Sequence, residues 1–422
     1  MYLYQSIRTV LILTSAIFLL PNVTGAAERV MIEDVPHIKN SATPSQGKRI
    51  IELQEQWRIG GDDDETLLGL VTRVREDDSG NLFVMDAQLS QIHVYDPAGN
   101  KIRTLFREGE GPAEIRGPRD MVIMNDGRIG AVQEMPGKLI FVNKNGDPAG
   151  SLTIGGAANE QGGFCQTFAA SAFKDLLVVT GFLQGQGTEP GHFTQTNFLS
   201  RADSEGSEIK RICETIHDLD FSNFSFDENK HLASYWWNND IGPDGKVYVA
   251  PKLNRYEIHV FDADGKLERV IEREYEPWKR TAEEREYFTR VIRAVYYGVP
   301  FEFEIITSEY EPVVLYMHRG LRVHADGSIW VLTTHGVRDQ AEGTMATFDV
   351  FSPEGDFTHQ VEVRGPWDGE HDGLFFFADD HAVIVTGYAD AMNAQFTGGN
   401  LTIDLTDDAA SVEVIRCGIS EK

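Results

Sequence analysis

Short apolar strands separated by glycine turns recur along this chain. Leu82–Met85 and Ile92–Tyr95 form one such pair, and its turn glycines, Gly80 and Gly99, stand 19 residues apart. The outline returns at 126–146, 244–265 and 326–355, and weaker copies fit at 173–206 and 379–408. Strands buried on both faces read as continuous apolar runs. Four antiparallel strands repeated every ~45 residues or more describe the blades of a β-propeller. Six copies predict six blades.

The segment Arg107–Glu114, REGEGPAE, carries a resemblance to a known family. It is similar to the inter-blade Gly-x-Gly-Pro-x-Glu signature of NHL-like six-bladed β-propellers exported by bacteria, and the likeness spans about residues 50–417. The resemblance implies an all-β fold with six four-stranded antiparallel blades. No catalytic motif of an enzymatic branch matches here, so it implies no activity.

Two further elements complete the predicted ring. Arg49–Ile59 reads as a strand that precedes the first blade. A propeller must hide its sheet edges, so we expect this strand to close the last blade by pairing beside Ala382–Thr386 and Leu401–Asp404; the alternative is an extra edge strand on the first blade. Thr281 and Glu284 form a capping box ahead of an amphipathic pattern, which predicts a helical insertion at about 281–298, between blades 4 and 5. That helix is either a structural brace or a lid.

The first residues resemble an export signal. Arg8 precedes the apolar stretch Val10–Leu20, which is followed by Pro21 and by small residues at 25–27. This order predicts a signal peptide at 1–26, a leader at 27–47, a propeller at 48–422, and a secreted or periplasmic protein; a retained membrane anchor is the alternative. No later segment has the roughly 18 apolar residues of a membrane span.

Charge and cysteine content narrow the classes of partner. Against 38 Lys and Arg stand 66 Asp and Glu, a net charge of −28, which opposes binding to nucleic acid or an anionic membrane. Cys165 and Cys213 fall in the third blade and either pair or stay free and buried, while Cys417 lies in the final strand. No C-x-x-C spacing signals zinc or redox chemistry.

The candidate binding residues come from the channel mouth, where we expect the inner strands to start. Guanidinium groups there suit a carboxylate, sulfate or phosphate, and a tryptophan suits a sugar ring. Arg319 belongs to the same group of arginines, and the alternative is that these arginines pair with local carboxylates. The candidates are Arg73, Arg119, Trp236, Arg255, Arg322 and His335.

The channel also offers ligands for a divalent metal, although no linear metal motif is present. The candidates are His335, His371, Asp86, Glu134 and Asp390. We therefore expect a ligand- or protein-binding module that acts through its channel-mouth face on a small anionic or sugar-like ligand or a protein. A metal-assisted lyase or hydrolase is the first alternative, and a structural module of an envelope assembly is the second.

Overall fold

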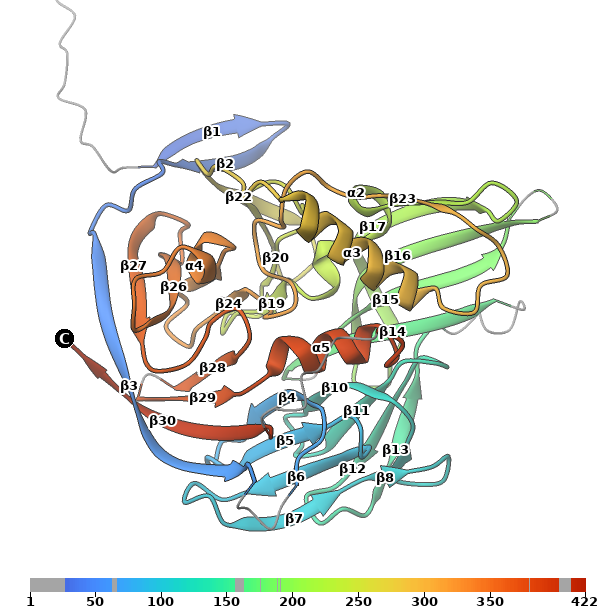
Figure 1. Ribbon diagram of the computed structural model, residues 1–422, viewed down its shortest axis with the longest axis horizontal. Helices are drawn as coiled ribbons and strands as arrows, with labels where there is room; N and C mark the ends of the chain where they lie inside the picture. The colour runs from blue at the N-terminus through green and yellow to red at the C-terminus, as the bar shows by residue number, and fades with distance from the viewer. Residues whose placement is uncertain are drawn as a thin grey trace, which may run out of the picture.

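The computed structural model describes residues 27–422 apart from 63–66, 156–162, 175, 188, 190, 379 and 402–410. Most of its elements are strands, and their sheets stand around a common centre, as Figure 1 shows. This is the arrangement of a β-propeller and agrees with the predicted all-β fold. The predicted signal peptide, 1–26, lies outside the described residues.

Three sheets each hold four consecutive antiparallel strands, as the repeat predicts. The first contains β4 (Val71–Glu76), β5 (Leu82–Asp86), β6 (Gln91–Tyr95) and β7 (Lys101–Leu105). The second contains β10 (Pro118–Ile123), β11 (Ile129–Gln133), β12 (Lys138–Val142) and β13 (Pro148–Thr153). The third contains β14 (Phe164–Phe173), β15 (Leu176–Gln186), β16 (His192–Asp203) and β17 (Glu208–Asp220), whose long hairpins project from the ring (Figure 1).

The fourth sheet has six strands because an N-terminal hairpin joins it. Its regular part is β19 (Asn239–Ile241), β20 (Val247–Val249), β21 (Glu257–Phe261) and β22 (Leu267–Arg273). The hairpin consists of β1 (Glu28–Ile32) and β2 (Val35–Asn40), and β2 runs parallel to β22. The segment expected as a leader thus covers the outer edge of this sheet, where Ile38 packs on Ile258 and Ile271.

The remaining large sheet has eight strands. It begins with β24 (Leu321–Val323), β25 (Ile329–Leu332), β26 (Thr344–Phe351) and β27 (Phe357–Arg364). It continues through β3 (Lys48–Gly60) to β30 (Glu413–Glu421), β29 (His381–Val385) and β28 (Gly373–Ala378). β3 pairs antiparallel with β30 and parallel with β27. The predicted pairing of this N-terminal strand with the blade that contains Ala382–Thr386 is therefore confirmed, and its direct partner there is β30. Of the expected segment 401–404, all but Leu401 lies outside the described residues.

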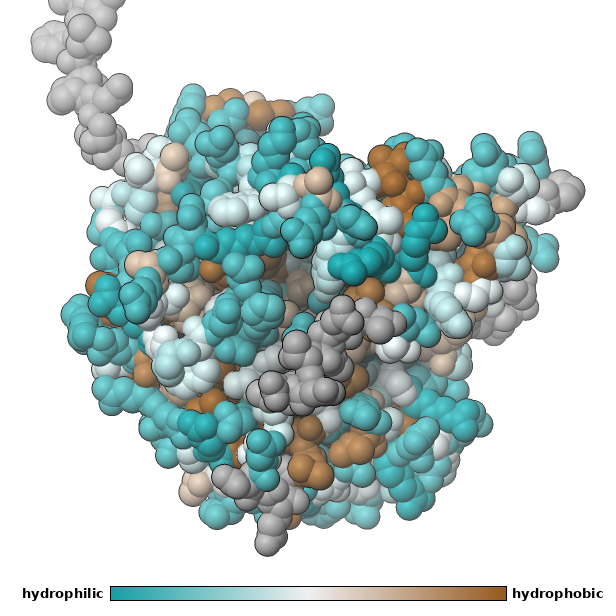
Figure 2. Space-filling model, viewed as in Figure 1, coloured by the Kyte–Doolittle hydropathy of each residue, from teal (hydrophilic) through white to brown (hydrophobic). Residues whose placement is uncertain are grey.

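Asx turns explain why the repeat is rich in aspartate. The Asp77 carboxylate accepts hydrogen bonds from the backbone N–H groups of Ser79 and Asn81, and Asp96 does the same for Ala98 and Asn100. Such a side chain caps its own turn. Asp203 and Asp262 repeat this pattern. Part of the acidic composition therefore consists of aspartates that cap their own turns. The face of the molecule seen in Figure 2 is largely hydrophilic.

The helices lie outside the repeat. The predicted insertion is α3 (Ala282–Val295), with the expected capping box, and it buries Phe288, Val291 and Ile292. A second helix, α5 (Tyr388–Phe396), follows β29 and was not predicted. The shorter elements are α2 (Glu228–His231), a 3-10 turn at Ser234–Trp236, α4 (His335–Arg338), and the parallel pairs β8 (Arg107–Glu108) with β9 (Glu114–Ile115) and β18 (Ser225–Asp227) with β23 (Glu304–Ile306).

The segment that resembles the family signature closes a loop between the first two sheets. Glu114 accepts a hydrogen bond from the Gly111 N–H at 2.8 Å and pairs with Arg107. A Cβ on Gly109 would lie 2.1 Å from the Glu114 carboxylate, which explains that glycine. The role of the segment Arg107–Glu114 is therefore structural.

The cysteines and the apolar segments complete the description. Cys165, Cys213 and Cys417 are all free, so the Cys165–Cys213 bridge considered above is not formed; Cys165 and Cys417 are fully buried. Within the described part of the chain, no helix is long and apolar enough to cross a bilayer.

Candidate functional site

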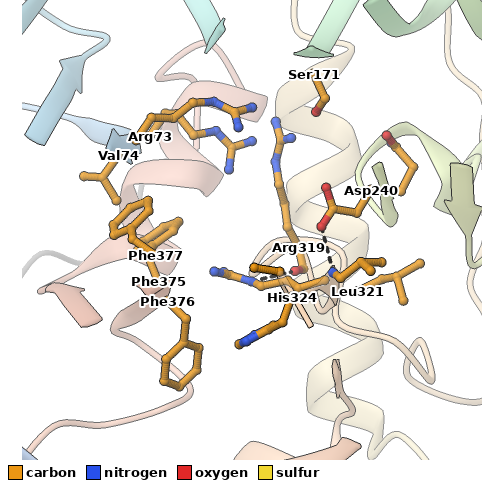
Figure 3. Close-up of a pocket in the computed structure, with 15 residues that line it drawn as sticks. Arg73, Val74, Ser171, Asp240, Arg319, Leu321, His324, Phe375, Phe376 and Phe377 are labelled. Carbon is orange, nitrogen blue, oxygen red and sulfur yellow. Dashed lines mark hydrogen bonds between the residues drawn. The ribbon is translucent and has the colours of Figure 1, made fainter. Parts of the chain in front are cut away.

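A cavity of about 240 Å³ lies between the inner strands of four sheets. Its walls come from the second half of β4, from β14 and β19, from β24 with the turn that follows it, and from β28. Figure 3 shows the lining side chains. They include charged and polar groups and a run of three phenylalanines that lies beside Arg73. The lining residues used in the argument are Arg73, Arg75, Asp240, Arg319, Arg322 and Phe375–Phe377.

Arg73 and Arg319 meet at one buried carboxylate. Asp120 is fully buried, and its two oxygens accept from Arg73 Nε at 2.6 Å and from an Arg319 terminal nitrogen at 2.8 Å. Asp120 also accepts from the N–H groups of Met121 and Ala170. Each arginine therefore bonds Asp120 through one nitrogen, and neither forms the bidentate pair that a guanidinium favours with a carboxylate.

The other two arginines have weaker partners. Arg75 donates to the carbonyl oxygens of Met121 at 2.7 Å and Ala170 at 3.1 Å, and lies 3.9 Å from Asp120. Arg322 donates to the carbonyls of Arg319 and His318 at 3.4 and 3.3 Å, and among the described residues no carboxylate pairs with it. Burial lowers the pKa of Arg322 to about 10, and the charges of Arg73 and Arg75 act in the same direction. Because this pKa is still well above 7, Arg322 stays charged at neutral pH.

Asp240 is the only acid among the cavity-lining residues of the described chain. It accepts from the backbone N–H groups of Ile241 at 2.9 Å and Val323 at 2.8 Å. Burial raises its pKa, against the effect of these hydrogen bonds and of Arg75 and Arg322. Backbone amides, not arginines, thus satisfy this carboxylate.

These contacts leave the cavity electropositive. Four guanidinium groups face or border it, while Asp120 and Asp240 are the carboxylates at hand, which leaves an excess of two positive charges. Arg319 Nε is buried with no acceptor among the described residues, and the terminal nitrogens of Arg73 have no described acceptor either. In a chain of net charge −28, this local excess is unusual. Buried unpaired cations are costly and call for an anion.

The run Phe375–Phe377, here called the phenylalanine wall, is apolar and packed. The Arg322 guanidinium stacks 5.0 Å over the ring of Phe375, which is itself buried against Tyr388. Phe376 packs on Trp330 and Phe348 at centroid distances of 5.3 and 5.6 Å. The wall is therefore held in place by contacts behind it.

The cavity lies toward the hairpin-turn end of the ring, away from the predicted mouth. Exposed Ala325, in the turn after β24, is part of its lining, so the cavity reaches the surface there. At the other end α5 packs across the starts of β4 and β10. Gln395 donates to the Pro118 carbonyl at 2.7 Å, and the Tyr388 hydroxyl donates to the Thr72 carbonyl. In Figure 1, α5 crosses the middle of the ring.

The structure brings two of the predicted ligand-binding residues together, Arg73 and Arg322, and adds Arg319. Arg119 is elsewhere: it pairs with Glu134 and donates to the Gln395 carbonyl at 2.7 Å, which ties α5 to β10. Arg255 is exposed, and among the described residues it pairs with Glu257 alone, at 3.4 Å.

The predicted Trp236 and His335 serve other contacts. Trp236 is 4% exposed inside an aromatic cluster, and its indole N–H donates to the Gly181 carbonyl at 2.9 Å. His335 lies between Tyr275 and Trp278 and bonds the Glu276 carbonyl at 3.0 Å. Neither residue lines the central cavity.

The predicted metal ligands do not gather. Asp86 is buried and accepts from the N–H groups of Gly69, Gln88 and Leu89, which makes it a loop cap. Glu134 pairs with Arg119, whereas His371 and Asp390 are exposed on different elements from His335. In the described ranges, no group of three or more His, Cys, Asp or Glu side chains is placed to hold a metal ion.

Sequence reasoning missed Arg75, Asp240 and the phenylalanine wall. A signal for Arg75 was present, because residues two apart in a strand point to the same side, and Arg73 was already a candidate. The phenylalanines at 375–377 read as ordinary buried strand. Nothing in the sequence joins them to arginines fifty or three hundred residues away.

Comparisons with known proteins assign no family. No family model matches the chain, and no curated protein matches it. Among solved structures, a DUF4221 family member from Bacteroides vulgatus is 10% identical with a TM-score of 0.47, covering 88% of this chain and 98% of that one. A Bacteroides fragilis protein whose name describes it as exported is also 10% identical (TM-score 0.45; 92% and 99% covered). A gluconolactonase from Xanthomonas campestris is 11% identical (TM-score 0.41; 86% and 98% covered). The function proposed below rests on the cavity itself.

Proposed function

We propose that this protein is an exported, NHL-like six-bladed β-propeller that binds a small organic anion in its central cavity. The blade count is supported by dividing the eight-stranded sheet between β27 and β3, which gives a fifth blade of β24–β27 and a sixth of β28–β30 closed by β3. Residues 1–26 are then the signal peptide and 48–422 the ring, with the hairpin at 28–40 added to the fourth blade.

The observation that carries the proposal is the unbalanced set of arginines. Four guanidinium groups border one cavity, and the two nearby carboxylates are occupied by two arginine nitrogens and by backbone amides. Terminal guanidinium nitrogens left without acceptors supply the forked donors that carboxylate, sulfate and phosphate groups take. A sugar-binding role has less support, since Trp236 is buried away from the cavity.

The test is a thermal-shift titration with phosphate, sulfate, succinate and citrate in a chloride buffer. We expect at least one of these anions to raise the melting temperature of the wild type, because binding to the native state alone stabilises it. Arg322→Met removes donors without stranding a carboxylate, and loss of a charged hydrogen bond of about 1.5–3 kcal/mol predicts roughly ten- to hundredfold weaker binding.

Arg255→Met is the matched control. This arginine is exposed, pairs with Glu257 and does not line the central cavity, so its loss leaves binding unchanged. An absence of any shift with all four anions, or equal weakening in both variants, contradicts the proposal.

A further inference from the structure

We infer that the ligand is a dianion that carries a compact ring-sized apolar group, bound with its charged end between the arginines and its apolar end on the phenylalanine wall. This inference rests on the proposed function and specifies its ligand. It follows from the charge of the cavity, its mixed charged and apolar lining, and its size.

The charge of the ligand follows from neutrality. The excess of two positive charges lies in a partly buried site, where an ion is poorly solvated and a counter-charge has a large effect. A monoanion leaves one guanidinium uncompensated, whereas a dianion compensates both. Dicarboxylates and phosphate monoesters share this charge near pH 8.

The position of the charged end follows from the free donors. Arg73 and Arg319 are held by Asp120 through one nitrogen each, so their remaining nitrogens are fixed in direction and available. Arg319 also has a left-handed backbone, with φ of 48°, a strained conformation that often marks functional residues. Figure 3 shows both side chains directed toward the same space.

The place of the apolar end follows from the phenylalanine wall. Phe375, Phe376 and Phe377 line the cavity beside these guanidiniums. Phe375 and Phe377 pack in one cluster, while Phe376 faces the other way, onto Trp330 and Phe348. A bare inorganic anion leaves this wall in contact with water, while a ring on it removes apolar surface from water.

The size of the cavity suits one ring with its charged substituent. A dry apolar cavity of about 150 Å³ holds benzene. The volume here, about 240 Å³, leaves room for a phosphate or a pair of carboxylates beside such a ring.

The experiment compares four probes by calorimetric titration of the wild type at pH 8. Phenyl phosphate has both features, phthalate replaces the phosphate by two carboxylates, inorganic phosphate lacks the ring and benzoate lacks the second charge. We expect phenyl phosphate or phthalate to bind at least tenfold more tightly than either inorganic phosphate or benzoate. Tighter binding of phenyl phosphate than of phthalate identifies a phosphate ester as the source of the dianion, and the reverse identifies a dicarboxylate.

Two variants test the two halves separately. Phe376→Leu keeps an apolar side chain but removes the ring; we expect it to weaken phenyl phosphate at least threefold and leave inorganic phosphate unchanged. Arg322→Gln lowers the excess charge by one, so it should weaken phenyl phosphate more than benzoate, while Arg255→Gln changes neither. A melting temperature for each variant confirms folding, and the wild-type comparison stands without the variants.

The outcomes separate this inference from the proposed function. If benzoate or inorganic phosphate binds as tightly as phenyl phosphate and phthalate, and Arg322→Gln still weakens binding, the inferred ligand class is wrong and the anion-binding function stands. If none of the four probes binds, both are overturned.

Discussion

Within the described part of the chain, the arginines beneath α3 and those of the central cavity differ in how their charges are met. Beneath α3, Arg280 is 5% exposed and donates through both terminal nitrogens to the two oxygens of Glu228, at 2.7 and 3.0 Å, and to Glu311 at 3.1 Å. Arg338 adds pairs with Glu284 and Glu311. In the central cavity, the arginines outnumber the carboxylates and none has a two-pronged partner.

The difference separates a structural charge cluster from a binding site. The cluster beneath α3 joins α2, the start of the helical insertion and the loop at 308–311, because Glu228 also accepts from the Ser308 N–H at 2.7 Å. Its charges are paired within the fold, although the Nε of Arg280, like that of Arg319, is buried without a described acceptor. The cavity arginines hold fixed positions and have N–H groups without an acceptor among the described residues. An external anion can accept hydrogen bonds from these groups.

Breaking the paired cluster has the largest expected effect. Arg280→Met leaves Glu228, whose pKa burial already raises, without its ion-pair partner. Loss of one member of a buried pair costs about 3–5 kcal/mol. Urea unfolding of the variant and the wild type measures this. A loss below about 1 kcal/mol would show that the pair is not a stabilising contact, and Lys279→Met, which removes an exposed pair with Glu309, is the control.

Protonation of Asp240 changes the charge balance of the central cavity and so tests its anion binding. Its pKa is raised by burial, so it takes up a proton at a higher pH than an ordinary aspartate and then no longer offsets Arg75 and Arg322. Sulfate stays dianionic in this range, and we expect its affinity to rise at least about threefold from pH 7 to pH 5. Asp240→Asn should bind sulfate more tightly at pH 7 and lose most of this dependence. Since His324 also lines the cavity, a variant with an unchanged pH profile would assign the effect to that histidine instead.

A small cluster of charged side chains lies where the first and last sheets meet, and its expected effect on stability is intermediate. His381 bonds Glu76 at 2.8 Å and Asp380 at 2.7 Å, and Arg416 also pairs with Glu76. The hydrogen bond to Glu76 is the main cause of the raised pKa of His381. A raised histidine pKa stabilises the fold fully below the unfolded value of about 6.5, and this contribution disappears as pH rises through the folded value.

The expected size of that effect is at most about 1 kcal/mol, because Arg416 also pairs with Glu76 and its charge lowers the pKa of His381. Unfolding free energies at pH 5.5 and pH 8.5, for the wild type and His381→Gln, isolate it. An identical pH dependence in the two proteins would remove His381 from the account.

The smallest expected effect is on stability at the cavity. Arg322→Met removes a charge that has no described carboxylate partner and keeps an unbranched side chain over Phe375. The free energy of unfolding should change by less than about 1 kcal/mol, in contrast to Arg280→Met. Denaturation of the ligand-free protein checks this, and a loss comparable to that of Arg280→Met would mean that the two clusters are both structural.

The sequence predicted the repeat better than the site, for a physical reason. Apolar runs such as Leu82–Met85 and turn residues such as Gly80 are local signals, so their strands and turns appear where expected. The capping box at Thr281 and Glu284 is equally local. α5 was missed because its apolar pattern is short, and it moves the accessible cavity to the turn end of the ring.

The site depends on contacts that the sequence does not display. Arg73 was identified by its place on an inner strand, but its meeting with Arg319 at Asp120 joins residues up to 246 positions apart. Whether an arginine is paired or free is set by such contacts: Arg119 and Arg322 are both on inner strands, yet only Arg119 finds a carboxylate, Glu134. Residue type alone does not separate them.

The most direct test is to locate an anion in a crystal. Selenate is a dianion with an anomalous signal, and a soak of the wild-type protein shows where it binds. We expect a selenium peak in the central cavity, within hydrogen-bonding reach of Arg73 and Arg319, and its loss in Arg322→Met crystals soaked in the same way. Peaks only on the outer surface, with an empty cavity at a selenate concentration that fills those sites, would contradict it.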